Sequence, residues 1–125
     1  MSAALSVAGL DPTDISFINA HGTATENNDE TESRAMIRLF NTLPAFASTK
    51  ANTGHTLGAA GAVEAIYSIL NLHYQEIYPA IHFTNPIEST GLKPVGAYLQ
   101  TPLKHIMSNS FGFGGNCSSL IFSKS

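Results

Sequence analysis

Residues 15–25 have the sequence Ile-Ser-Phe-Ile-Asn-Ala-His-Gly-Thr-Ala-Thr, and they point to a class of fold. The β-branched and aromatic residues of 15–20 predict a buried strand, and the polar loop 21–25 follows at its carboxyl end. Asn27 and Asn28 then offer an N-cap for a helix. In that helix the acidic side chains come first and the arginines last, which is the order that the helix dipole favours. A strand, a polar loop and a helix in this order indicate an α/β protein.

The same order of elements recurs along the chain. Residues 45–48 predict a second short strand, which leads through the polar loop 49–55 into a helix from about Leu57 to Tyr74. No repeat or low-complexity tract marks a boundary, so residues 1–125 are expected to form one domain. Residues 1–10 predict a short first helix, and residues 76–102 a proline-rich connecting loop. Residues 105–122 predict a hairpin with a Gly-rich tip.

The helix expected at 57–74 has an unusual distribution of polar side chains. Glu64, Ser68, Asn71 and Gln75 follow one another at helical spacing and form a narrow stripe on an otherwise apolar cylinder. Such a helix is expected to be mostly buried, in the middle of the protein. Its opening residues are glycine and alanine, so other backbone segments can approach it closely.

The composition excludes several classes of protein. A single cysteine among 125 residues excludes a disulfide scaffold, and a formal net charge of −3 without a basic stripe argues against a nucleic-acid surface. No apolar run approaches the ~20 residues of a membrane span, and nothing near residue 1 resembles a signal peptide, so a soluble, cytoplasmic protein is expected. Charged residues make up 12% of the chain, against about 25% in a typical soluble domain. We therefore expect much of its surface to pack against other protein.

Two histidines are the candidates for chemistry. His21 and His55 each follow a predicted strand, in a loop rich in small and hydroxyl-bearing residues. Ligands of α/β sheets bind beyond the carboxyl ends of the strands, so the two imidazoles would converge there if the strands are neighbours. Two N–H groups directed at one oxygen would stabilise enolate charge. Lys50 would lie at the same rim, and a buried lysine needs a carboxylate partner, for which we predict Glu64.

Other interpretations of these residues are simpler. A lone histidine is more often structural than catalytic, and His73, His82 and His105 are assigned no chemistry. No metal site is expected, because the two histidines come without cysteine ligands or HExxH spacing. The glycines at 112–115 favour a tight hairpin over a phosphate cradle. Cys117 is expected to be a small buried residue, since nothing marks it as an activated nucleophile.

Three motifs together suggest a family. They are N-A-H-G-T-A-T-E-N-N-D-E-T-E at 19–32, S-T-K-A-N-T-G-H-T-L-G-A-A-G-A-V-E-A at 48–65 and S-N-S-F-G-F-G-G-N at 108–116. In this order they resemble the β-ketoacyl-acyl-carrier-protein synthases, the condensing enzymes of fatty-acid and polyketide synthesis, over the C-terminal half of the catalytic unit. The resemblance implies a thiolase-like fold, in which two similar α/β halves form five layers and the complete enzyme is usually a homodimer.

The resemblance also implies roles for particular residues. His21 and His55 match the two histidines of a Cys-His-His triad. Lys50 matches the family's lysine, which lies behind the second histidine, and Glu64 matches the family's glutamate. The reaction implied is a decarboxylative condensation of a malonyl thioester with an acyl thioester, without a cofactor. Four further residues match substrate-binding positions of the family. Thr23 and Thr25 match the hydroxyls that contact the phosphopantetheine arm of acyl carrier protein. Phe111 and Phe113 match the family's Gly-Phe-Gly-Gly loop, in which Phe113 matches the phenylalanine that gates the acyl pocket.

The chain departs from the family pattern in two respects. The nucleophilic cysteine belongs to the N-terminal half, and nothing in this chain resembles that segment. Asn116-Cys117 stands where family members more often carry Thr-Asn, so Cys117 is no substitute. The chain alone is therefore expected to be inactive, with the missing half as its partner. A non-catalytic partner akin to a chain-length factor and a thiolase-fold enzyme that uses coenzyme A are the alternatives, although two histidines argue against the second.

Overall fold

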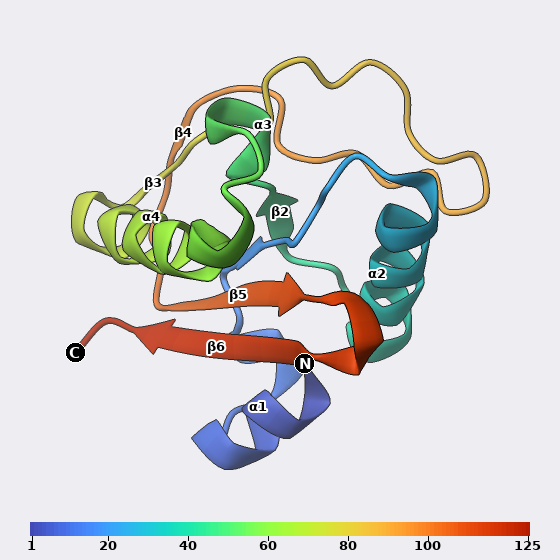
Figure 1. Ribbon diagram of the computed structural model, residues 1–125. Coiled ribbons are helices and arrows are strands. Elements are labelled where there is room, and N and C mark those ends of the chain that lie inside the picture. Colours follow the sequence, from blue (N-terminus) through green and yellow to red (C-terminus); the bar gives the residue numbers. More distant parts are fainter.

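A computed structural model describes all 125 residues as a mixed β-sheet with helices on both faces (Figure 1). The sheet has the strand order β2-β1-β5-β6, in which β1 pairs in parallel with both β2 and β5, and β6 runs antiparallel to β5. The strands span Phe17–Asn19 (β1), Ala45–Ala47 (β2), His105–Phe111 (β5) and Cys117–Ser123 (β6). The predicted α/β class is confirmed, and the first two strands are parallel neighbours, which is the condition for the convergence of the two histidine loops.

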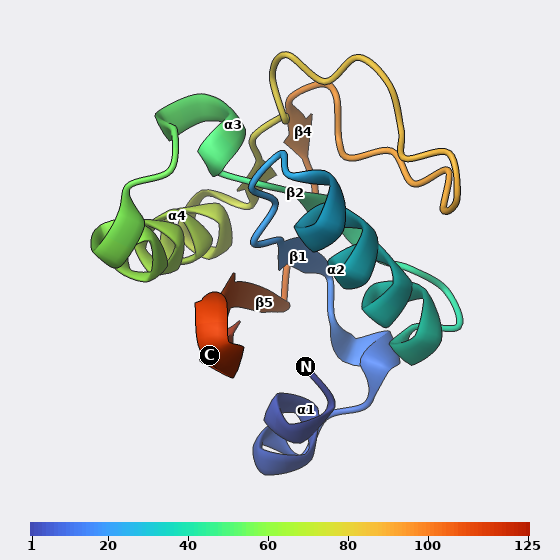
Figure 2. The ribbon, with the colours of Figure 1, turned by 45° about the vertical axis from the view of Figure 1, so that its right-hand side comes forward.

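Three helices cover the sheet. Two of them, α1 and α2, lie on one face, and α4 lies on the other (Figure 2). A four-residue helix, α3, follows β2, and the short strands β3 and β4 form a separate antiparallel pair within the proline-rich segment. The bounds are Ser2–Ala8 (α1), Glu26–Leu39 (α2), Lys50–Thr53 (α3), Ala60–Tyr74 (α4), Glu76–Ile77 (β3) and Leu99–Gln100 (β4). None of these helices is long and apolar enough to cross a membrane.

Alternation along β1 divides the core into two layers. Ile18 packs with α1 and α2, whereas Phe17, one residue earlier, packs with α4, because successive side chains of a strand point to opposite faces. The same alternation in β5 places Met107 on the α1/α2 side and Ile106 on the α4 side. Asn19 therefore points toward α4, where its side chain donates a hydrogen bond to the Glu64 carbonyl oxygen.

Several element boundaries differ from those expected. The helix α2 begins at Glu26 with Thr25 as its N-cap residue, ahead of the asparagines expected to cap it. The helix α4 begins at Ala60 because Leu57 has a φ of 52°, which is incompatible with a continuous helix, and residues 57–59 form one turn of 3-10 helix. The loop expected at 49–55 contains α3.

The polar stripe of α4 faces the sheet. Glu64, Ser68 and Asn71 are buried, whereas Ile66 and Ile69 remain 58% and 51% exposed. Burial of the polar side is possible because the buried groups have partners on neighbouring elements, as described below. The apolar side of α4 is the face that this chain leaves uncovered.

Cys117 is exposed, so the expectation of a buried cysteine is wrong. It is the first residue of β6, the outermost strand of the sheet, and it follows the Gly-rich tip of the hairpin. Residues 112–118 are all exposed, so the side chain lies in a solvent-exposed stretch at the edge of the sheet.

Candidate active site

The imidazoles of His21 and His55 meet above the carboxyl ends of β1 and β2. Their ring centroids lie 5.7 Å apart with the planes perpendicular. His21 follows β1 directly, and His55 follows α3, which continues from β2. The two loops converge because β1 and β2 are parallel neighbours, so their carboxyl ends lie at the same edge of the sheet. The arrangement of the two rings expected from the sequence is present.

The contact with Lys50 determines which ring nitrogen of His21 carries the proton. The Lys50 Nζ lies 3.1 Å from Nδ1 of His21 and donates to the His21 carbonyl oxygen at 2.6 Å. An ammonium group can only donate, so Nδ1 carries no proton and the proton of the neutral ring lies on Nε2. Burial, the charge of Lys50 and the neighbouring His55 lower the pKa of His21 to about 4, against a smaller opposing effect of Asp29. His21 is therefore neutral at physiological pH.

The backbone fixes the tautomer of His55 in the same way. The Leu57 N–H donates to Nδ1 of His55 at 3.1 Å, which requires an unprotonated Nδ1 and leaves the proton on Nε2. The left-handed conformation of Leu57 belongs to this turn. Both rings thus present an Nε2–H donor, although each is oriented by a different partner.

Lys50 and Glu64 form a buried ion pair. The ammonium donates to Oε1 of Glu64, and Oε2 accepts a hydrogen bond from the Ser110 hydroxyl at 3.0 Å. Both side chains are almost completely buried. A buried pair is tolerated when further hydrogen bonds satisfy its remaining atoms, as Ser110 and His21 do here. The pairing predicted from the sequence is present.

Glu32 is a buried carboxylate that the sequence analysis did not select. It accepts hydrogen bonds from the backbone N–H groups of His21 and Gly22 and from the side chain of Asn109, each at 3.0 Å. Burial raises its pKa, and these hydrogen bonds oppose the shift. Glu32 lies one helical turn before the buried Met36, and this acid on an apolar face of α2 was the signal in the sequence.

Gly22 lets the two histidine loops approach each other. Its φ is +40°, and a Cβ at this position would lie 2.5 Å from Cβ of Ser48. The Ser48 hydroxyl donates to the Gly22 carbonyl oxygen at 3.0 Å. Only glycine fits here, because a side chain would collide with the loop that carries Lys50.

The four substrate-binding candidates, Thr23, Thr25, Phe111 and Phe113, lie in different surroundings. Thr23 and Thr25 have their hydroxyls 2.8 Å apart at an exposed rim, and a cavity of about 700 Å³ extends from Thr23 and His55 toward α2 and residues 80–94. The Phe111 ring centroid lies 5.8 Å from that of His21. Phe113 is fully exposed at the tip of the hairpin. No cluster of three or more His, Cys, Asp or Glu side chains is arranged to hold a metal ion.

Comparison with known proteins identifies the family. A family profile described as "Beta-ketoacyl synthase, C-terminal domain" matches residues 1–84. The chain belongs to the β-ketoacyl synthase family. The mitochondrial 3-oxoacyl-[acyl-carrier-protein] synthase of Arabidopsis thaliana is 44% identical over 130 residues, covering 98% of this chain and 28% of that protein. Synthase 2 of Staphylococcus aureus (strain COL) is 39% identical over 128 residues, covering 99% and 31%.

Solved β-ketoacyl synthase structures have the same fold. A β-ketoacyl synthase from Burkholderia phymatum STM815 superposes with a TM-score of 0.94 at 36% identity, covering 100% of this chain and 31% of that one. The ishigamide ketosynthase/chain length factor gives a TM-score of 0.95 at 32% identity, covering 99% and 31%. The fold is thus thiolase-like, as the motifs implied. The chain spans about a third of the length of the curated relatives it matches.

Proposed function

We propose that this chain is the histidine-bearing C-terminal part of a 3-oxoacyl-[acyl-carrier-protein] synthase, which condenses malonyl-acyl-carrier-protein with an acyl thioester. The single observation that carries the proposal is the pair of neutral imidazoles, each presenting an Nε2–H donor from a fixed tautomer. The proposed site residues are His21, His55, Lys50 and Glu64 for catalysis, with Thr23, Thr25, Phe111 and Phe113 for the substrate.

The two donors suit the decarboxylation step. With the thioester carbonyl oxygen of the malonyl group between the Nε2–H groups, breaking the bond to the carboxylate releases carbon dioxide and leaves an enolate. Donors already directed at that oxygen stabilise the new negative charge without reorganising. The α-carbon of the enolate then attacks the acyl thioester and displaces the thiolate of the nucleophilic cysteine. In this proposal His21 acts as a donor in its neutral form, which agrees with its low pKa.

Lys50 and Glu64 would act on His21 rather than on the substrate. Lys50 is buried between the ring of His21 and Glu64, so its charge opposes protonation of Nδ1. Glu64 compensates that charge and allows it to stay buried. We therefore assign them the task of holding the first imidazole neutral and correctly turned.

The proposed synthase also requires a cysteine-bearing N-terminal half and an acyl carrier protein. One superposed structure is described as an acyl-carrier protein in complex with its ketosynthase, and the exposed Thr23 and Thr25 hydroxyls are suited to hydrogen-bond the amides of such a carrier's phosphopantetheine arm. The exposed apolar side of α4, with Ile66 and Ile69, is where we place the missing N-terminal half. A homodimer of the complete enzyme belongs to the same proposal.

A chain-length-factor-like partner is the second candidate. Two of the superposed structures are described as assemblies of a ketosynthase and a chain length factor, so the fold accommodates both roles. The enzyme is favoured because both histidines and Lys50 are in place: Lys50 contacts Nδ1 of His21, and the Leu57 N–H donates to Nδ1 of His55.

Two measurements test the proposal. Purified chain mixed with malonyl- and acyl-acyl-carrier protein should form no condensation product, because its single cysteine, Cys117, lies at the exposed end of β6. The same residues within a polypeptide that supplies the cysteine-bearing half should release carbon dioxide and form the 3-oxoacyl product. In that polypeptide, His55→Ala should abolish release of carbon dioxide from the malonyl group. Near-normal release would remove His55 from its proposed role, and turnover by the chain alone would refute the need for a second half.

A further inference from the structure

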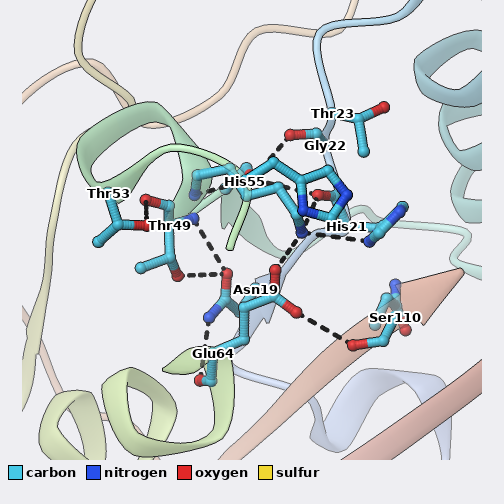
Figure 3. Close-up of polar contacts among 12 residues, drawn as sticks. Asn19, His21, Gly22, Thr23, Thr49, Thr53, His55, Glu64 and Ser110 are labelled. Atoms are coloured by element: carbon cyan, nitrogen blue, oxygen red, sulfur yellow. Dashed lines mark hydrogen bonds and ion pairs between the residues drawn. The ribbon is translucent and has the colours of Figure 1, made fainter. Parts of the chain in front are cut away.

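Asn19 makes a set of buried contacts that the proposed mechanism does not use. It is the last residue of β1, two positions before His21, and it is 2% exposed. Its side-chain oxygen accepts hydrogen bonds from the N–H and the hydroxyl of Thr49, at 3.3 and 2.8 Å. Its NH₂ group donates to the Glu64 carbonyl oxygen at 3.2 Å and approaches the Ser68 hydroxyl at 3.4 Å. Figure 3 shows the carboxamide between Thr49 and the backbone of Glu64.

Thr49 transmits this contact to Lys50. Thr49 stands at the N-cap position of α3, yet its side chain makes no capping hydrogen bond to that helix. Its hydroxyl and its N–H are both directed at Asn19 instead. The first residue of α3 is Lys50, so the point from which the lysine side chain extends is fixed relative to β1.

The NH₂ group acts on the other partner of the ion pair. The Glu64 carbonyl oxygen lies in the first turns of α4 and accepts hydrogen bonds from both Asn19 and the Ser68 hydroxyl. Asn19 thus holds α4 at the residue whose carboxylate meets Lys50. Through one side chain, the strand before His21 is connected to the helix of Lys50 and to the helix of Glu64.

We propose that Asn19 is a positioning residue of the candidate active site, which holds Lys50 and Glu64 in place against Nδ1 of His21 by its hydrogen bonds to Thr49 and to the Glu64 backbone. A carboxamide carries an acceptor oxygen and an NH₂ donor group on one short side chain, so it can accept from Thr49 and donate to Glu64 at the same time. The significance of this role for catalysis rests on the proposed function, whereas the geometric role does not.

The titration of His21 separates positioning from simple stabilisation. Lys50, His55 and Asp29 are the charged or titratable groups that act on the His21 ring, and Glu32 lies against its backbone. Of these, Asn19 positions only Lys50. If Lys50 moves away from Nδ1, its contribution is lost and the pKa of His21 rises from about 4 toward 6.5. Burial, the largest cause of the low pKa, persists when Lys50 alone moves, so the rise is partial, and a matched buried variant away from His21 shows the effect of a general loss of stability.

The experiment follows the titration of His21 by NMR in the polypeptide that also carries the cysteine-bearing half, labelled with ¹³C-histidine. The variant His21→Gln identifies the His21 resonance. Asn19→Leu removes both functions of the carboxamide, and Thr49→Val removes the hydroxyl in a side chain of the same shape. Asn71→Leu is the matched control, because Asn71 is another buried carboxamide that donates to a backbone oxygen, that of Glu76, away from the histidines. Both site variants should raise the pKa of His21 by roughly one unit or more, and the control should not.

The proposal is overturned if Asn19→Leu and Thr49→Val lower stability as Asn71→Leu does while His21 still titrates near 4. Should Asn19→Leu fail to fold, Thr49→Val alone decides the result. The acid limb of malonyl decarboxylation should shift together with the titration. If the polypeptide that also carries the cysteine-bearing half releases no carbon dioxide, the proposed function fails, but the titration still tests the role of Asn19.

Discussion

The ammonium group of Lys50 lies 3.1 Å from Nδ1 of His21, a residue 29 positions away in the chain. A cation beside a histidine nitrogen is unusual, since it opposes protonation of the ring. Here Glu64 compensates the charge, and the carbonyl oxygen of His21 accepts a second hydrogen bond from the same ammonium. Burial and this contact together lower the pKa of His21 to about 4, so the ring is a neutral donor at neutral pH and the protein has a defined response to acid.

The first prediction concerns pH. The pKa of His21 falls from 6.5 in the unfolded chain to about 4 in the folded one. Folding therefore favours the neutral ring, so this contribution to stability is present above pH 6.5 and is lost as the pH falls from 6.5 toward 4. Denaturant unfolding across this range should show the loss, and malonyl decarboxylation should decline near pH 4. An acid limb near pH 6.5 would contradict the low pKa of His21, which burial and Lys50 together produce.

The second prediction concerns the buried ion pair. Glu64→Gln leaves the Lys50 charge without compensation in the interior and should lower the free energy of unfolding by about 3–5 kcal/mol. The double variant Lys50→Met with Glu64→Gln should recover part of that loss, because no uncompensated charge remains. Thermal unfolding measures both. An unchanged melting temperature for Glu64→Gln would show that the pair does not stabilise the fold.

The third prediction concerns the approach of the two loops. Gly22→Ala would place a Cβ 2.5 Å from Cβ of Ser48 at a φ of +40°, and should cost about 2–4 kcal/mol of stability. Gly58→Ala is the control, since a Cβ at that position meets nothing within 4 Å. Adding Ser48→Gly to Gly22→Ala should restore part of the stability. Equal effects of the two alanine variants would exclude the steric explanation.

The fourth prediction concerns Glu32. In Glu32→Gln one of the two carboxylate oxygens becomes an NH₂ group, which faces an N–H donor of His21, Gly22 or Asn109. A buried donor without an acceptor should cost about 1–3 kcal/mol, measured by urea unfolding. Glu30→Gln, two residues earlier on the exposed side of α2, should have little effect. Comparable losses in the two variants would show that the contacts of Glu32 carry no net stabilisation.

Much of the candidate site was predictable from local sequence. Strand, loop and helix follow one another around His21 and around Lys50 and His55, and parallel strands bring such loops to one edge. The pairing of Lys50 with Glu64 was predictable because each is a charge without a local partner. Glu32 was missed because an acid early in a helix has an ordinary local explanation, the helix dipole.

The exposure of particular residues was not predictable in this way. The stripe of Glu64, Ser68 and Asn71 was recognised in the sequence, but spacing alone does not show which side of a helix meets the sheet. The structure turns the polar side inward, toward Asn19, Lys50 and Ser110, and leaves Ile66 and Ile69 exposed. Likewise, Cys117 is exposed because of the place of β6 at the edge of the sheet.

The sequence by itself determined the order of strands and helices, the two histidine loops and the membership of the family, because these depend on residue type and on spacing along the chain. Only the tertiary structure decided which nitrogen of each imidazole carries the proton, and that Asn19 connects three separate elements. The protonation of His21 depends on Lys50, a neighbour 29 positions away that strand pairing brings close. That of His55 depends on the N–H of Leu57 in a local turn, whose left-handed φ the residue type does not indicate. A contact between residues far apart in the chain has no fixed spacing, so local pattern cannot specify it.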